Sequence, residues 1–139
     1  MTTALDTNVL LPLLVSSASE HQRSKAWLEQ HEDRLVTTHT NIAEFLRVAS
    51  HPRVFAAPLS LNAAVGLIAR FVDDFEVELL HESDRWWRAL VEVKLPLHGN
   101  DVFDARIALC LRHHGVDAIC SFDSGFARFD FLTLIVPSS

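Results

Sequence analysis

Short apolar strands alternate with amphipathic helices along almost the whole chain, and this alternation constrains the fold more than any other feature. Apolar runs predict strands at residues 2–7, 34–38, 76–80, 117–122 and 132–136. Helical spacing predicts helices at residues 9–15, 20–30, 40–50, 61–75, 83–93 and 101–115. Because strands joined through helices pair in parallel, we expect an α/β fold with a central, mostly parallel sheet of four or five strands and helices on both faces.

Three serines precede helical patterns and are predicted N-caps, because a serine hydroxyl can accept a hydrogen bond from the first free N–H groups of a helix. They are Ser19, Ser60 and Ser83. Pro52 and Gly115 follow helical patterns and predict where those helices end.

A length of 139 residues without an internal repeat or linker predicts one domain, residues 1–139. Cys110 and Cys120 lack metal-ligand spacing, so we expect both to be buried and reduced.

The N-terminus has no basic start and carries Asp6 inside its apolar run, unlike a secretion signal. The sequence has no run of the roughly 18 apolar residues that a membrane span needs. We therefore expect a cytoplasmic protein without a membrane segment.

Asp6 is the one charged side chain among the first nineteen residues, and it lies within the apolar segment ALDTNVLLPLL. The first Lys or Arg along the chain is Arg23, so Asp6 has no basic neighbour in sequence. Burying an unpaired carboxylate costs several kcal/mol or forces its protonation. The position of Asp6 therefore predicts a ligand or partner from elsewhere in the fold.

Four further acids have apolar flanks: Glu44, Asp101, Asp104 and Asp123. Asp6 and Asp123 each lie at the end of a predicted strand, and the carboxyl ends of parallel strands meet at the edge where ligands bind. Asp101 and Asp104 are three residues apart on one face of a predicted helix. If these acids converge, only a hard divalent cation makes their charge tolerable, and Mg²⁺ or Mn²⁺ fits carboxylate ligands best.

Most of these acids also have an alternative local role. Asp6 could form an Asx turn at the end of its strand, and Asp123 could open the turn of the segment DSG. Asp101 and Asp104 could interact with the helix dipole in the first turn of their helix. Each alternative explains one acid, but none explains why all the segments share apolar flanks.

Glu44 has two alternatives of its own within the segment NIAEFL. It could form a capping box with Asn41, in which each side chain accepts from the other residue's backbone N–H. It could also pair with Arg47, three residues later on the same helix face.

Taken in order, four segments resemble the PIN-domain ribonucleases, especially the VapC-type toxins of bacterial and archaeal toxin–antitoxin pairs. The segments are LDTNVLL, TNIAEFLRV, DVFDARIALCLRHHGV and ICSFDSGFARF, and together they span nearly the whole chain. The resemblance implies a PIN-like three-layer sandwich. It also implies metal-dependent cleavage of RNA phosphodiester bonds, with Mg²⁺ as the cofactor and Mn²⁺ as a substitute.

By resemblance, Asp6, Glu44, Asp104 and Asp123 form the acidic quartet of the family. Asp6, Asp104 and Asp123 are expected to bind the metal directly or through water. Glu44 is expected to bind the metal or to orient the attacking water.

A second group of residues is expected to support the quartet: Thr7, Asn8 and Ser121. Ser121 stands where the family usually has Thr, which preserves the hydroxyl. Asp101 stands where this subgroup is usually apolar, so it is either an additional pocket acid or a first-turn charge.

The resemblance also implies an RNA substrate, a small cognate antitoxin and a homodimer. The neighbours Trp86 and Trp87 suit a dimer interface, because one helix face cannot bury both. Alternatively, one lies in the core and the other along the surface. The remaining functional alternative is a catalytically silent PIN-like domain that binds protein or RNA.

The net charge of −6 argues at first against a nucleic-acid partner. If the five pocket acids are set aside, however, thirteen acidic side chains remain against twelve basic ones. Ten of those twelve are arginines, which bind phosphate in a bidentate fork. The charge is therefore compatible with RNA binding, although the sequence does not show which arginines contact RNA.

Overall fold

Strand β1 lies at the centre of a five-stranded parallel sheet in the computed structural model, which describes residues 1–138. The strand order is β3-β2-β1-β4-β5, and every pairing is parallel. The strands are β1 (Thr2–Leu5), β2 (Arg34–Thr38), β3 (Glu78–Leu80), β4 (Ala118–Cys120) and β5 (Thr133–Ile135). The predicted α/β class and the parallel sheet are confirmed.

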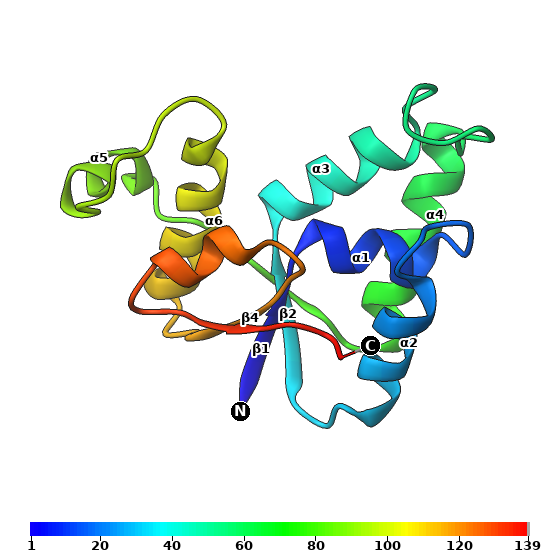
Figure 1. Cartoon of the computed structure of the whole chain (residues 1–139), viewed down its shortest axis with the longest axis horizontal. Helices are drawn as coiled ribbons and strands as arrows, with labels where there is room; N and C mark the ends of the chain where they lie inside the picture. The colour runs from blue at the N-terminus through cyan, green and yellow to red at the C-terminus, as the bar shows by residue number, and fades with distance from the viewer. Residues whose placement is uncertain (139) are drawn as a thin grey trace.

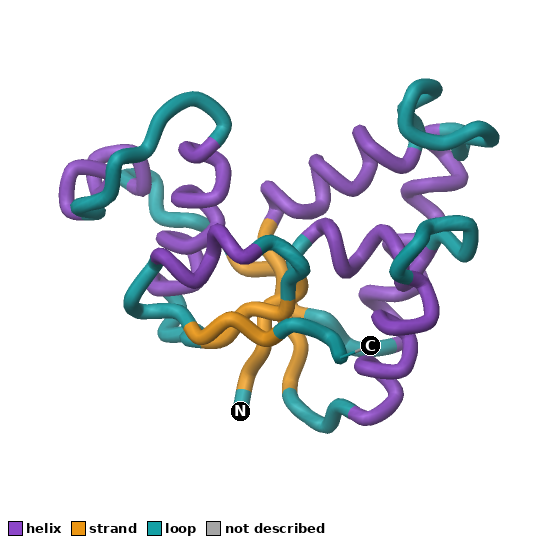
Figure 2. The backbone as a smooth tube through the Cα atoms, in the orientation of Figure 1, coloured by secondary structure: helices purple, strands orange, loops and turns teal. Residues whose placement is uncertain are grey.

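Helices cover both faces of this sheet and make three layers. Figure 1 shows α1 to α4 on one side of the strands and α5 and α6 on the other, and Figure 2 shows the strands between the two sets. The α-helices are α1 (Thr7–Leu14), α2 (His21–Gln30), α3 (His39–Ala49), α4 (Leu61–Asp74), α5 (Trp86–Ala89) and α6 (Asp101–His113). Two 3₁₀ helices are η1 (Leu90–Glu92) and η2 (Ser124–Arg128).

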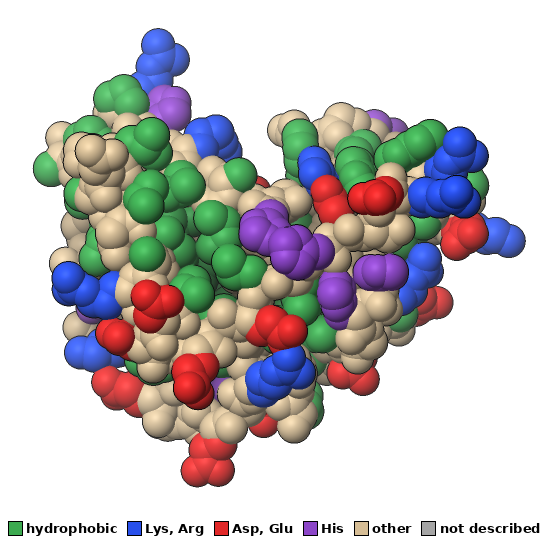
Figure 3. Space-filling model, turned by 180° about the vertical axis from the view of Figure 1, so that it is seen from behind, with side chains coloured by type: hydrophobic (Ala, Val, Ile, Leu, Met, Phe, Trp, Pro, Cys, Tyr) green, Lys and Arg blue, Asp and Glu red, His purple; other side chains and the backbone are tan. Residues whose placement is uncertain are grey.

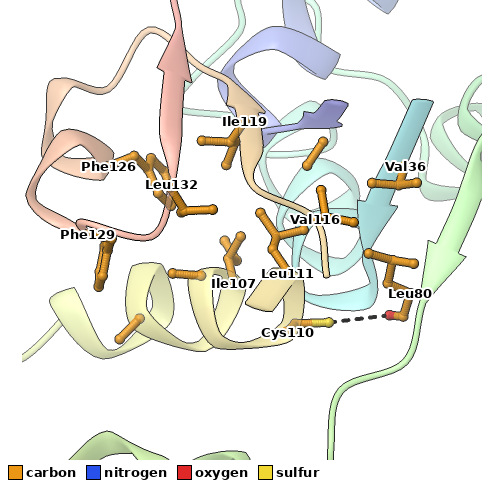
Figure 4. Packing of buried hydrophobic residues seen from close by; sticks show 13 residues of the cluster. Val36, Leu80, Ile107, Cys110, Leu111, Val116, Ile119, Phe126, Phe129 and Leu132 are labelled. Atoms are coloured by element: carbon orange, nitrogen blue, oxygen red, sulfur yellow. Dashed lines mark hydrogen bonds between the residues drawn. The ribbon is translucent and has the colours of Figure 1, made fainter. Parts of the chain in front are cut away.

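One hydrophobic core lies between the sheet and α6. Val36 of β2 and Ile119 of β4 point into it (Figure 4), because alternate side chains of a strand face opposite sides of the sheet. Ile107 and Leu111 are four residues apart on α6 and meet these strand residues. Phe126 closes the core from η2. The core therefore anchors α6, which carries two of the candidate acids.

The second core lies on the opposite face of the sheet. Leu5, Leu35 and Cys120 each neighbour a residue of the first core along their strand and point the other way. They pack with Phe45 of α3 and Ile68 of α4. Full burial of a side chain such as Phe45 contributes roughly 1.5–3 kcal/mol. This core holds α1 and α3, which carry the candidate residues Thr7, Asn8 and Glu44.

Both cysteines are buried and free, as predicted. Burial raises the pKa of the Cys110 thiol to about 11 and that of Cys120 to about 12. Since the thiolate is the reactive form, burial keeps both thiols in their less reactive, protonated state.

Two of the predicted N-caps are wrong. The N-cap of α2 is Glu20, which makes no side-chain capping bond, so Ser19 lies outside the cap. The N-cap of α5 is Arg85, and Ser83 instead accepts a hydrogen bond from the backbone N–H of Arg85 in the preceding turn. Ser60 is confirmed, since its side chain accepts from the N–H of Ala63 at the start of α4.

The predicted helix over residues 83–93 is also shorter than expected. Only Trp86–Ala89 form an α-helix, followed by the 3₁₀ turn η1. No residue of either segment is buried, and a short helix gains most of its stability from burying an apolar face.

Within residues 1–138, no helix combines the length and the apolar content that crossing a membrane requires.

Candidate active site

The candidate residues gather where β2, β1 and β4 end. Asp6 follows β1, Asn41 lies in the first turn of the helix that follows β2, and Ser121 and Asp123 follow β4. These three strands are neighbours in the sheet and run in the same direction. Their carboxyl ends therefore bring residues from distant parts of the chain to one edge, as expected for a parallel sheet.

Asp6 is buried, at 6% exposure, and three neutral donors bind its carboxylate. The backbone N–H of Thr7 and the side-chain amide of Asn41 donate to Oδ1 at 2.8 and 3.0 Å. The hydroxyl of Ser121 donates to Oδ2 at 2.7 Å. The N–H bond from Thr7 makes Asp6 the N-cap of α1, so its local role coexists with its place at the strand ends.

The charge of Asp6 is poorly compensated. The pKa of Asp6 is raised to about 6, mainly by burial and also by the negative charges of Glu44 and Asp123, although the hydrogen bonds from Ser121 and Thr7 lower it. Neutral donors stabilise a carboxylate without cancelling its charge. Asp6 therefore retains the capacity to bind a cation.

Asn41 connects Asp6 to the beginning of α3. Its side-chain amide donates to the hydroxyl of Thr7 as well as to Asp6, and its Oδ1 accepts from the hydroxyl of Thr38 at 2.7 Å. Thr38 is the N-cap of α3 and accepts from the backbone N–H of Asn41. The proposed capping box between Asn41 and Glu44 is therefore wrong, because α3 begins before Asn41.

Ser121 and Asn8 bind the end of β4 to the start of α1. The hydroxyl of Ser121 accepts from the backbone N–H of Asp123 at 2.9 Å and lies 3.2 Å from Oδ1 of Asn8. Oδ1 of Asn8 also accepts from the backbone N–H of Phe122 at 3.0 Å. These contacts hold Asp123 beside Asp6, so Ser121 and Asn8 lie next to two of the candidate acids.

Asp123 takes its predicted turn role as well. Its Oδ1 accepts from the backbone N–H of Gly125 at 2.8 Å and caps η2. A side chain on residue 125 would place its Cβ 3.0 Å from this oxygen, so a larger residue would require the Asp123 carboxylate to shift by a few tenths of an ångström. The carboxylate of Asp123 is exposed, and its charge acts on both Asp6 and Asp104.

The first turn of α6 brings Asp101 and Asp104 to the same edge. The pKa of Asp104 is raised to about 6, mainly by burial and also by the charges of Asp123 and Asp6, although Arg128 lowers it. The guanidinium of Arg128 lies 3.3 Å from Oδ2 of Asp104 and 3.5 Å from Oδ1 of Asp101. Arg128 therefore bridges both acids from η2.

Glu44 faces these acids from α3. Burial raises its pKa, the charge of Asp104 raises it further, and Arg47 lowers it. The charge of Arg47 therefore acts on Glu44, but none of the ion pairs within residues 1–138 joins these two side chains, and Asp104 repels Glu44.

A groove of about 790 Å³ separates α3 from α6 and opens onto this edge. Figure 3 shows the molecule hollowed between the two sets of helices. Arg47 and Glu44 line the groove from α3, and Asp101, Phe103 and Asp104 line it from α6. The groove thus joins acids to an exposed aromatic ring, since Phe103 is 51% exposed.

As the side chains lie, no three His, Cys, Asp or Glu residues within residues 1–138 surround one point closely enough to hold a metal ion. The charges of neighbouring acids nevertheless raise the pKa values of Asp6, Glu44 and Asp104. Their oxygens are hard donors of the kind that Mg²⁺ and Mn²⁺ bind. We call Asp6, Glu44, Asp101, Asp104 and Asp123 the carboxylate cluster.

The sequence alone does not mark Asn41 or Arg128 as site residues. Asn41 precedes Glu44 by three residues and so shares a side of α3 with it, which is a weak signal. Arg128 lies five residues after Asp123, within a segment that has no regular apolar spacing.

Comparisons with known proteins place the chain in a family. The family model for the PIN domain matches residues 3–132. Ribonuclease VapC48 of Mycobacterium tuberculosis is 34% identical over 97 residues, which cover 68% of this chain and 67% of that protein.

Solved structures show the same fold. The crystal structure of Mycobacterium tuberculosis VapC20, described as a Sarcin-Ricin loop cleaving toxin, superposes with a TM-score of 0.69 at 18% identity, over 90% of this chain and 92% of that one. The structure of VapBC-1 from nontypeable Haemophilus influenzae superposes with a TM-score of 0.66 at 18% identity, over 98% of each chain. With these matches to its fold and sequence, the chain belongs to the PIN-domain family and to the VapC type within it.

Proposed function

We propose that this protein is a metal-dependent endoribonuclease, the toxin of a VapBC-type toxin–antitoxin pair. One observation carries the proposal: Asp6, Glu44 and Asp104 come from three separate elements, and each has a pKa raised by burial and by the charge of another acid. Perturbed acids converging at the edge of a groove are typical of a catalytic site.

Mg²⁺ is the proposed ion, with Mn²⁺ as a substitute, held by Asp6, Asp104 and Asp123, and by Glu44 directly or through water. The donor set fits, because the five carboxylates outnumber the two arginines beside them, Arg47 and Arg128, and a divalent cation would supply the missing positive charge. When bound, the ion would lower the pKa of a water molecule and neutralise charge on the phosphoryl oxygens.

The protein's own residues position this chemistry. Glu44 is proposed to orient the attacking water, since its raised pKa favours accepting a proton at a carboxylate oxygen. Thr7, Asn8 and Ser121 are proposed to hold the acids of the strand ends in place through the hydrogen bonds described above. Asp101 is proposed as an auxiliary acid, because it shares Arg128 with Asp104.

The proposed substrate is RNA, and the proposed partner is a small cognate antitoxin. The similar structure of VapBC-1 bears the name of a toxin–antitoxin complex, which supports this partner. A homodimer is proposed by resemblance; Trp87 is 53% exposed and Trp86 is half-buried, so the pair is divided between a covered and an exposed position.

Cleavage of RNA by purified, antitoxin-free protein tests the activity and its metal dependence. We expect cleavage in Mg²⁺ and none in EDTA. Asp6→Asn and Asp104→Asn should each lose more than the roughly 10–100-fold that outer-shell changes cost, and Asp101→Asn should lose less. Asp74→Asn, at an exposed position on α4, is the matched control and should retain full activity.

Equal cleavage by the unaltered protein and Asp6→Asn would contradict the mechanism. A folded protein that binds RNA without cleaving it in Mg²⁺ or Mn²⁺ would support the alternative, a catalytically silent PIN-like domain. Circular dichroism and melting curves of every variant separate lost chemistry from lost folding.

A further inference from the structure

A second cavity, of about 370 Å³, lies between α5 and α6, outside the carboxylate cluster. Three arginines line it, Arg85 and Arg88 from the α5 segment and Arg112 from α6. The one carboxylate among its lining residues is Glu92. We call this cavity the arginine pocket. Its charge is opposite to that of the carboxylate cluster.

The positive charge of the arginine pocket is only weakly compensated. Glu92 lies 3.6 Å from Arg112, but the two side chains are 69% and 41% exposed, so the pair contributes little. In the part of the chain that the structure describes, no ion pair involves Arg85 or Arg88. Two guanidinium groups are therefore available to an anionic ligand.

Aromatic rings lie beside these arginines. Arg106 lies over the ring of Trp86 at 4.6 Å and binds Glu82 through two hydrogen bonds of 2.7 and 2.5 Å, so Trp86 is held in place. The guanidinium carbon of Arg88 lies over the exposed ring of Trp87, 4.7 Å from the ring centroid. Guanidinium groups next to exposed aromatic rings suit single-stranded nucleic acid, which offers phosphates and unstacked bases.

The arginine pocket lies within reach of the carboxylate cluster along one helix. Asp104 and Arg112 are eight residues apart on α6, which is about 12 Å along the helix axis. Lys and Arg side chains stand together on the α5 side of the molecule, at the right of Figure 3. A single RNA strand could therefore pass from the groove to this side of the molecule.

We propose that the arginine pocket is a second RNA-contact site, which binds phosphates of the substrate strand beyond the carboxylate cluster. This inference rests on the proposed ribonuclease function. It accounts for RNA binding by a chain of net charge −6, because the carboxylate cluster repels phosphate unless a metal is bound, whereas the arginine pocket needs none. A second copy of the chain fits the arginine pocket less well than RNA does. If two such pockets met face to face, their arginines would repel one another.

Binding of a single-stranded RNA of roughly twelve nucleotides, measured by fluorescence anisotropy in EDTA, tests the proposal without cleavage. The double variant Arg85→Gln/Arg88→Gln should bind about tenfold more weakly. The slope of log affinity against log salt concentration should become shallower by about 0.7 for each phosphate that the variant no longer neutralises. The matched control is Arg53→Gln/Arg70→Gln, which removes two exposed arginines from the α4 side and should bind like the unaltered protein.

Each other outcome overturns the proposal. An equal loss of affinity in both double variants would mean that only net charge matters, and unchanged affinity in both would mean that the pocket does not bind RNA. Weakened self-association or antitoxin binding, with RNA binding intact, would make the pocket a protein interface. No binding by the unaltered protein at low salt would also overturn it, because the pocket requires no metal. Since this assay involves no cleavage, it is independent of the test of ribonuclease activity.

Discussion

Asp6 is buried among three neutral donors, and no ion pair within residues 1–138 involves it. Its apolar flanks and its lack of a basic neighbour are visible in the sequence, so its importance is predictable. The donor Asn41 is not predictable in the same way, because its contact with Asp6 depends on β1 pairing with β2. The chemistry of a residue can be inferred from its neighbours in the sequence. The contact between Asp6 and Asn41, which are 35 residues apart, can be inferred only once the pairing of the strands is known.

The raised pKa of Asp6 predicts a pH dependence of stability in metal-free protein. The folded state holds the Asp6 proton more tightly than the unfolded state, so stability falls as the pH rises from 3.8, and the loss is complete above about 6. The shift corresponds to at most about 3 kcal/mol. Asp6→Asn removes this penalty and should be as stable as the unaltered protein, or more stable by about 1 kcal/mol, near neutral pH.

Urea unfolding in EDTA at about pH 4.5 and about pH 7.5 checks this expectation, with Asp74→Asn as the control for a neutralised exposed acid. The advantage of Asp6→Asn should be fully present at the higher pH and clearly smaller at the lower, where most of the penalty has not yet developed. If Asp6→Asn is less stable than the unaltered protein at both pH values, its hydrogen bonds to Thr7, Asn41 and Ser121 matter more than its charge.

The 3₁₀ helix η2 is an element that the sequence patterns do not predict. It spans Ser124–Arg128, and so short a segment shows no helical repeat of apolar residues. It buries Phe126 against α6 and thereby places Arg128 between Asp101 and Asp104. Long helices such as α6 are predictable because their apolar residues repeat at helical spacing. The position of η2 depends on its tertiary contacts, so it can be identified only in the structure.

Arg128→Met should destabilise the metal-free protein by roughly 1 kcal/mol, because it leaves Asp101 and Asp104 without their shared cation but retains most of the apolar stem. Mg²⁺ should reduce this difference, since the ion supplies positive charge to the same acids. Melting curves in EDTA and in Mg²⁺ measure both effects.

Arg34→Met is the matched control, because Arg34 pairs with Glu78 at a more exposed position of the sheet. Its effect should be smaller and independent of Mg²⁺. Equal losses of stability in the two variants, with no response to Mg²⁺, would mean that Arg128 acts as an ordinary surface ion pair.

The whole molecule unites acids that the sequence separates by up to 117 positions, from Asp6 to Asp123. Their meeting at one edge is predictable from the α/β class, because parallel strands end on the same side of the sheet. The strand order β3-β2-β1-β4-β5 is not contained in any local pattern, and it decides which strand ends are neighbours. The acids can therefore be chosen from sequence, but their distances and the Arg128 bridge cannot.

The convergence of these acids in the folded state predicts how Mg²⁺ affects the stability of the protein. Unfolding disperses the carboxylate cluster, so an ion that binds there binds the folded state alone and stabilises it by about 2.7 kcal/mol at a concentration of 100 times Kd. The melting temperature of the unaltered protein should rise by several degrees in millimolar Mg²⁺, and less in Asp6→Asn and Asp104→Asn. Asp74→Asn should respond like the unaltered protein. An equal rise in all four proteins would mean that Mg²⁺ binds outside the carboxylate cluster, while no rise in any of them would contradict a magnesium site in this fold.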